Sequence, residues 1–208
     1  LGRTQEILAV LASLMREGAL RRQPIYIGGL GRVFTEIYDL EAHRTHRSLS
    51  SLRLDEALEL TVIDRNALDS MKLNGRIFVV TAGMMTEKTP AHELAARMAG
   101  DPKHAIFFVG YADPDSPGGR LKAAKQGETF AFSPGAGELV KNCEVDDFDL
   151  SAHANREELL DFVGQTGAHT VLLGHGDDPA RAWFDEQIRA RYPKTKVHQA
   201  QPGVTIDA

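Results

Sequence analysis

Two histidines occupy equivalent positions in the last third of the sequence. His153 lies in the stretch DLSAHANREELL (149–160) and His175 lies in TVLLGHGDDPARAWF (170–184); each follows a strand-like run and precedes a helical one. In parallel α/β sheets, ligands gather outside the carboxyl ends of strands, where loops lead into helices. Helix N-termini at that edge favour an anion such as phosphate. The two histidines can be interpreted as a functional pair or as two ordinary loop residues, and the sequence pattern supports both interpretations about equally.

The residues after each histidine predict where the next helix begins. Asn155 can cap the helix that follows His153, and Glu158, three residues on, would complete a capping box. Asp178 can cap the helix that follows His175, with a proline as the next residue. Because each histidine then stands just before a helix, neither is expected on an apolar core face.

Small residues end two other strand-like runs and suggest a second set of binding residues. Thr81 and Gly83 follow one run, and Gly110 follows the next. Open glycine turns at strand ends can let a nucleic-acid backbone approach closely, although packing alone can also require them. We predict substrate contacts at Thr81, Gly83 and Gly110, together with Ser151 beside the first histidine. Tyr111 could stack on a base or pack at the rim.

Strand-like and helix-like segments alternate along the chain and predict an α/β fold. Helices are expected over 4–17, 32–43, 155–164 and 178–192, with another beginning after Thr89. Strands are expected over 24–29, 76–85, 105–111, 145–150, 170–174, 196–200 and 204–206. The segment 48–74 is expected to be connecting helix and loop, 112–119 a turn, and 126–147 mainly short antiparallel strands and loops. Continuous apolar strands between helices favour a parallel sheet covered on both faces.

Composition excludes some classes of protein. The 208 residues carry a formal net charge of −5, so no overall basic field favours nucleic acid, although a bound metal or a local basic groove can supply positive potential. Cys143 is the only cysteine, which excludes an internal disulfide and favours a reducing, cytoplasmic compartment. No apolar run approaches the roughly 20 residues of a membrane span, so we expect no membrane association.

Several motifs, in this order, resemble one family. The sequence is similar to the β-CASP branch of the metallo-β-lactamase fold, which includes ribonuclease J-type enzymes and the endonuclease of pre-mRNA cleavage and polyadenylation. The motifs are LGRTQEIL (1–8), TAGMM (81–85), FFVGY (107–111), LSAHANREELLDFV (150–163) and VLLGHGDD (171–178). The resemblance implies a three-layer α/β β-CASP domain with a parallel sheet over 1–147. It also implies that 148–208 is the returning C-terminal segment of a metallo-β-lactamase αββα domain.

The resemblance also implies roles for the two histidines. His153 falls where the family places a histidine that acts near the scissile phosphate, as a general acid or transition-state stabiliser. His175 falls where the family places a ligand of a catalytic pair of Zn²⁺ ions. The family has Glu after this His-Gly, whereas this chain has Asp177, a shorter side chain.

The other zinc ligands of the family are missing from this sequence. Its main signature, His-x-His-x-Asp-His, occurs nowhere in the chain. A two-metal site needs several ligands, so we expect the half that carries them to precede Leu1, and this chain alone to be metal-free and inactive. Strands left without the rest of their domain would expose an apolar face, so we also expect a homodimer or self-association.

The resemblance therefore predicts part of a zinc-dependent nuclease that processes RNA, with two Zn²⁺ ions in the complete protein. In that reaction a metal-bound hydroxide would attack the phosphodiester of single-stranded RNA, and His153 would assist departure of the leaving oxygen. A non-catalytic relative that binds RNA or a partner subunit is the main alternative. A hydrolase acting on a small molecule is a third candidate.

Overall fold

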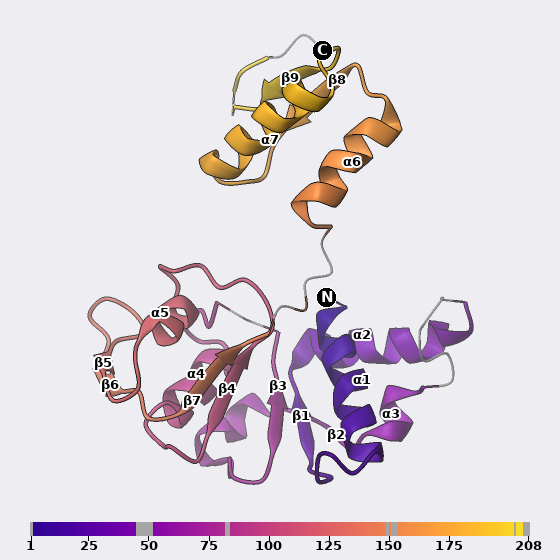
Figure 1. The fold of residues 1–208 in the computed structure, drawn as a ribbon. Coiled ribbons are helices and arrows are strands. Elements are labelled where there is room, and N and C mark those ends of the chain that lie inside the picture. The colour runs from indigo at the N-terminus through magenta and orange to yellow at the C-terminus, as the bar shows by residue number, and fades with distance from the viewer. Residues whose placement is uncertain are drawn as a thin grey trace. The chain divides into compact units, whose positions relative to one another are not determined.

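The computed structural model divides the chain into two units. The described residues are 2–44, 52–81, 84–148, 150, 154–201 and 203–205. The N-terminal unit comprises Leu1–Ala152 and the C-terminal unit comprises His153–Ala208 (Figure 1). Both units combine helices with parallel strands, which confirms the α/β fold class.

A three-stranded parallel sheet lies in the N-terminal unit. Its order is β2-β1-β3, with bounds Leu60–Val62, Ile25–Ile27 and Ile77–Val79. β1 is the central strand, and its Ile25 lies opposite Leu60 on one side and Ile77 on the other. Because all three strands are parallel, their carboxyl ends meet at one edge of the sheet.

The first face of this sheet is covered by α1 (Arg3–Arg16) and α3 (Leu54–Ala57). Side chains alternate along a strand, so Ile25 and Ile27 both point to this face. There they pack with Leu8 of α1, and all three of these side chains have no exposed surface. Full burial of one such side chain contributes about 1.5–3 kcal/mol to folding.

The second face is covered by η2 (Arg65–Ser70) and α4 (Pro90–Met98). Tyr26, which alternates with the two buried isoleucines of β1, packs here with Leu68 of η2 and Leu94 of α4. Helical elements therefore lie on both faces of the parallel sheet, which gives the N-terminal unit three layers.

A second pair of parallel strands, β4 (Ala105–Phe108) and β7 (Glu144–Asp147), has its own core. Phe108 and Cys143 are buried there together with residues of α4 and of α5 (Pro117–Ala123). The other elements of this unit are α2 (Gly29–Leu40), η1 (Glu41–His43) and the antiparallel pair β5 (Thr129–Phe130) and β6 (Leu139–Val140).

Three elements of this unit differ from the sequence-based expectation. β2 lies within 48–74, where helix and loop were expected, because a strand of three residues is too short to show a clear alternation. β7 overlaps the strand expected over 145–150, but it pairs in parallel with β4, so the end of 126–147 is not antiparallel. α5 begins inside the expected turn 112–119, because the Ser116 hydroxyl caps it by accepting a hydrogen bond from a backbone N–H.

The C-terminal unit is smaller and has one layer of helices. Its elements are α6 (Arg156–Thr166), β8 (Thr170–Leu173), α7 (Asp178–Arg191) and β9 (Lys196–Gln199). The two strands are parallel, and Leu160, Ile188 and Val197 form the buried core. The expected strand over 204–206 is absent at residues 204 and 205; residue 206 lies outside the described residues. Among the described residues, no helix has the length and apolarity needed to cross a membrane.

Candidate functional site

The ends of β1 and β3 lie side by side at the carboxyl edge of the β2-β1-β3 sheet. Gly28 follows β1, and a Cβ atom added there would lie 3.9 Å from a methyl group of Val80, which follows β3. Thr81 is the next residue and is exposed to solvent at this edge. Val80 also packs against the buried cluster that contains Phe108 of β4.

The first turn of α1 joins the end of β1 to the end of β4. A Cβ atom on Gly31, in the first turn of α2, would lie 3.5 Å from the methyl group of Thr4. A Cβ atom on Gly110, just after β4, would overlap the guanidinium of Arg3 and lie 3.0 Å from its Cζ. Thr81 follows β3 and Gly110 follows β4, which are strands of two separate sheets, and Arg3 lies beside Gly110.

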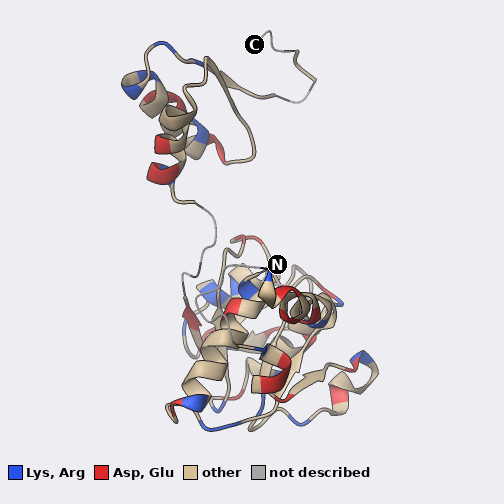
Figure 2. Ribbon diagram, turned by 90° about the vertical axis from the view of Figure 1, so that its right-hand side faces the viewer, with Lys and Arg blue, Asp and Glu red and all other residues tan. Residues whose placement is uncertain are grey.

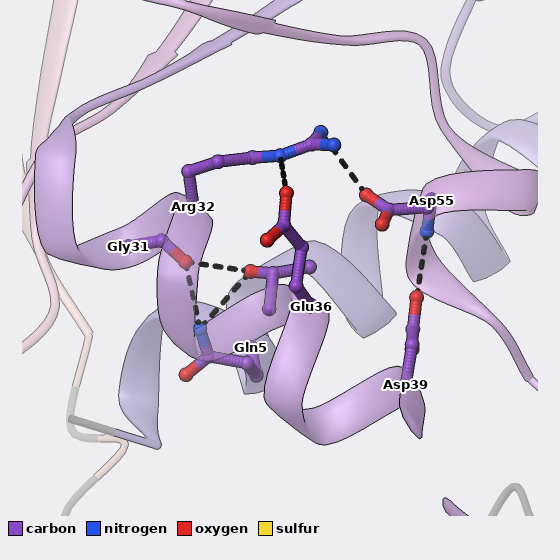
Figure 3. A network of polar contacts seen from close by, with 7 residues as sticks. Gln5, Gly31, Arg32, Glu36, Asp39 and Asp55 are labelled. Atoms are coloured by element: carbon purple, nitrogen blue, oxygen red, sulfur yellow. Dashed lines mark hydrogen bonds and ion pairs between the residues drawn. The ribbon is translucent and has the colours of Figure 1, made fainter. Parts of the chain in front are cut away.

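A buried polar network holds this end of α1 against α2 (Figure 3). The Gln5 side-chain amide donates to the Gly31 carbonyl at 3.3 Å and to the Thr35 hydroxyl at 3.1 Å. The Thr35 hydroxyl in turn donates to the Gly31 carbonyl at 2.8 Å. Gln5 is only 4% exposed and Thr35 has no exposed surface, so the network fixes the start of α1 within the core.

Ion pairs connect α2 to α3 on the outer side of this network (Figure 3). Arg32 contacts Glu36 at 2.8 Å and Asp55 at 3.2 Å, and the Asp55 backbone N–H donates to an Asp39 carboxylate oxygen at 2.9 Å. Pairs of this exposure are worth at most about 1 kcal/mol each. Their main effect is that Arg32 is neutralised by its neighbours.

The turn after β3 has an unusual backbone. Met85 has φ 52° and Lys88 has φ 64°, which lie in the left-handed region that non-glycine residues rarely adopt. The Gly118 N–H donates to the Met84 carbonyl at 3.0 Å, and His92 Nδ1 lies 3.0 Å from the Met85 carbonyl. The described part of the turn is thus held by specific hydrogen bonds, and such held conformations are concentrated at functional sites.

His175 also lies in the left-handed region, with φ 53°. It is exposed, follows β8 directly through Gly174, and precedes Gly176. A non-glycine residue held in this conformation costs of order 1–3 kcal/mol, so the surrounding turn must determine it. The turn therefore presents the His175 imidazole to solvent at the carboxyl end of β8.

The carboxylates after His175 differ from the expectation. The N-cap of α7 is Asp177 and not Asp178, and the Asp177 side chain makes no capping hydrogen bond. Asp178 instead forms an ion pair with Arg181 in the first turn of the helix. The helix therefore begins one residue earlier than predicted, with Pro179 as its second residue and not its first.

The other predicted site residues fall outside the described residues. These are Gly83, Ser151 and His153, so their roles stay predictions. The helix after His153 does begin as predicted. Asn155 Oδ1 accepts from the Glu157 and Glu158 backbone N–H groups at 3.0 Å each, and the Glu158 carboxylate accepts from the Asn155 N–H at 2.7 Å. This confirms the predicted capping box of α6.

A complete metal site does not form within the part of the chain that the structure describes. No group of three or more His, Cys, Asp or Glu side chains there could hold an ion. Cys143 would be a soft ligand only as a thiolate, but burial raises the pKa of this thiol, so it stays protonated at neutral pH. The described donors therefore do not fit a pair of Zn²⁺ ions, and His175 supplies a single imidazole.

Charge on the surface is mixed. Figure 2 shows basic and acidic residues interspersed over the N-terminal unit. Lys122 of α5 pairs with Asp147 at 2.7 Å. Tyr111, beside Gly110, is 70% exposed and is not part of a core. No role is predicted for Arg3 and Gln5 from the sequence, although both lie in the LGRTQEIL motif, which is the signal that could have identified them.

Comparison with known families agrees with this fold. The Beta-Casp domain model matches residues 4–121, which is more than half of the chain. The chain belongs to the β-CASP family. A second model, described as the Zn-dependent metallo-hydrolase RNA specificity domain, matches residues 138–199 of this β-CASP chain. The resemblance found from the sequence motifs is thereby confirmed.

Three curated relatives of this β-CASP chain carry names that refer to RNA or transcription. Probable RNase MJ4 of Methanocaldococcus jannaschii is 29% identical over 182 residues, which cover 85% of this chain and 39% of that protein. RNase aCSPSF2 of Saccharolobus solfataricus is 28% identical, over 85% of this chain and 33% of its own length. Transcription termination factor FttA of Methanosarcina mazei is 26% identical, over 94% and 32%. The β-CASP chain thus spans about a third of the length of these relatives.

Proposed function

We propose that this chain is part of a zinc-dependent β-CASP nuclease that cleaves phosphodiester bonds of single-stranded RNA. The main support is the ordered match to two domain models, of which the second is described as a zinc-dependent RNA specificity domain. Relatives named as RNases add to it. The β-CASP domain is assigned to 1–147, and 148–208 is assigned to the returning segment of the metallo-β-lactamase domain.

His175 is assigned as a zinc ligand and His153 as a residue that acts on the substrate. The assignment of His175 is supported by its left-handed backbone and its exposed position in the turn after β8. His153 stands two residues before Asn155, the N-cap of α6, whose first backbone N–H groups can attract a phosphate oxygen. The remaining zinc ligands are assigned to parts of the protein outside the described residues.

The first test uses the 208-residue chain. Because one imidazole binds a transition metal weakly, we expect less than stoichiometric zinc after dialysis and no cleavage of a labelled single-stranded RNA. Elemental analysis and a gel assay measure the two quantities. One or more equivalents of retained zinc would contradict the assignment of the missing ligands.

The second test separates the two histidines in the full-length protein. His175→Ala should lower zinc content and turnover together, since loss of a ligand weakens the whole site. His153→Ala should leave zinc in place and reduce turnover by about 10²–10⁴-fold, as is typical for loss of a positioned proton donor. His169→Ala is the matched control, because His169 is an exposed histidine of the same unit.

Equal loss of zinc in both variants would refute the division of roles, as would full activity of His153→Ala. A wild-type protein that retains zinc and binds RNA without cleaving it would support the non-catalytic alternative. Failure of the wild-type protein to bind RNA would count against both the nuclease proposal and the non-catalytic alternative.

A further inference from the structure

Arg3 differs from the other partly buried arginines of the N-terminal unit. Its Nε atom is buried and has no hydrogen-bond partner, and no ion pair among the described residues includes it. By contrast, Arg32 pairs with two carboxylates, and Arg97 donates to the carbonyls of Leu68 and Met71. Arg3 is therefore a partly buried cation that forms no ion pair within the described part of the protein.

An unmatched guanidinium has an energetic cost that a ligand could offset. Arginine stays charged at every physiological pH, so it cannot avoid the cost by losing its proton. A buried donor without an acceptor costs about 1–3 kcal/mol, and more when it is charged. A ligand that accepts hydrogen bonds from the Arg3 guanidinium would remove this cost when it binds.

The Arg3 guanidinium lies against the backbone of Gly110. Any side chain at this glycine position would overlap the Nη1 atom. Two residues further along α1, Gln5 is fixed to Gly31 and Thr35 in the core. Gly110 therefore provides the space in which the Arg3 side chain lies at the end of β4.

The position of Arg3 suggests the nature of its acceptor. It lies where the ends of β1 and β4 meet the first turn of α1, which is the edge at which ligands of parallel sheets gather. The planar guanidinium fork pairs with phosphate through two parallel hydrogen bonds. In a chain of net charge −5, a cation without a carboxylate partner is a local site for a polyanion.

We propose that Arg3 binds a phosphate of the RNA strand and that Gly110 is the residue that positions its guanidinium. This proposal rests on the proposed function, because it names a binding residue for the same substrate. The role of Gly110 is then indirect: it makes room for a side chain that contacts RNA.

Binding of a labelled single-stranded oligoribonucleotide to the full-length protein, followed by fluorescence anisotropy at several salt concentrations, tests the proposal. Arg3→Met keeps most of the side-chain volume and removes the charge, so affinity should fall by about tenfold, the loss typical of a hydrogen bond to a charged group. The slope of log affinity against log salt should decrease by about 0.7, the value for one phosphate contact on a single strand. Arg3→Lys keeps the positive charge but loses the planar guanidinium, so its affinity for RNA should lie between those of the wild type and Arg3→Met.

Gly110→Ala is the decisive second variant, because it leaves every charge in place and displaces the guanidinium. Its affinity should approach that of Arg3→Met, while circular dichroism shows an unchanged fold, since the overlapping atom is the end of a flexible side chain. Arg16→Met, at the other end of α1 and 63% exposed, is the matched control and should bind like wild type.

Three outcomes would overturn the proposal. If Arg3→Met and Gly110→Ala both bind like Arg16→Met, Arg3 has no part in binding, although the proposed function stands. If affinity falls without a change in salt slope, Arg3 has a structural role only. If the wild-type protein does not bind RNA at all, the proposed function fails together with this inference.

Discussion

The two units bury their strands in different ways. In the N-terminal unit, neighbouring residues of β1 enter separate cores on opposite faces of the sheet, with Ile25 on one side and Tyr26 on the other. In the C-terminal unit, Val171 of β8 packs under the helices while the next residue, Leu172, is 55% exposed. The comparison shows that strands of similar composition can form a complete three-layer core or only one side of a core.

The largest difference is expected when each core loses one buried side chain. Ile188 of α7 has no exposed surface and is one of three residues in the core of its unit. Ile188→Ala should cost about 2–5 kcal/mol and unfold the C-terminal unit, because few other contacts compensate for the cavity. Hydrogen exchange should then show lost protection in α6, α7 and β8, with β1 still protected.

Ile25→Ala, at an equally buried site of the N-terminal unit, is the matched substitution. A similar cost should lower the stability of that unit without unfolding it, since its core extends over both faces of the sheet. If Ile188→Ala leaves the C-terminal unit fully protected, the contrast between the two cores is wrong.

A smaller effect is expected from the buried polar network, which only the N-terminal unit has among the described residues. Gln5→Met replaces the amide by an apolar group of similar shape, so Gly31 and Thr35 lose a donor. The free energy of unfolding should fall by about 1–3 kcal/mol. Urea denaturation of Gln5→Met measures this loss. Gln165→Met, at an exposed position of α6, is the control and should change it by less than about 0.5 kcal/mol.

The smallest change in stability is expected from substitutions at the N-caps of α6 and α7 in the C-terminal unit. Asn155 caps α6 through two hydrogen bonds, whereas the Asp177 side chain makes none at the start of α7. Asn155→Ala should therefore lower stability by about 1 kcal/mol, and Asp177→Ala by a few tenths at most. Thermal denaturation of the two variants checks the difference, and equal shifts would mean that the capping box contributes nothing.

Local signals allowed much of the fold to be predicted. The helix start after Thr89 and the capping box at Asn155 are predicted from short motifs and are confirmed, because the residues that form them are close together in sequence. Ser116 with Pro117 has the same cap-and-proline pattern and starts α5, but the two glycines that follow favoured a turn. A Cβ atom at Gly119 would overlap the Asp113 carbonyl, a requirement that only the folded chain reveals.

The site was predicted less completely, for a different reason. His175 could be located from its place after a strand, but its left-handed backbone could not, since histidine rarely adopts it. The contact between Arg3 and Gly110 joins residues more than a hundred positions apart, and no periodic pattern encodes such a pair. A strand over 145–150 is expected from the sequence, but its parallel pairing with β4 joins segments far apart in the chain and cannot be read from local patterns.

The place of Cys143 gives the molecule two built-in reporters. This cysteine is the only one in the chain and is fully buried beside α4 in the N-terminal unit, so a thiol reagent can react only when that core opens. The only tryptophan, Trp183, lies in the C-terminal unit with its ring 5.0 Å from that of Phe184. Thiol labelling and intrinsic fluorescence therefore follow the opening of one unit each, without any engineered probe.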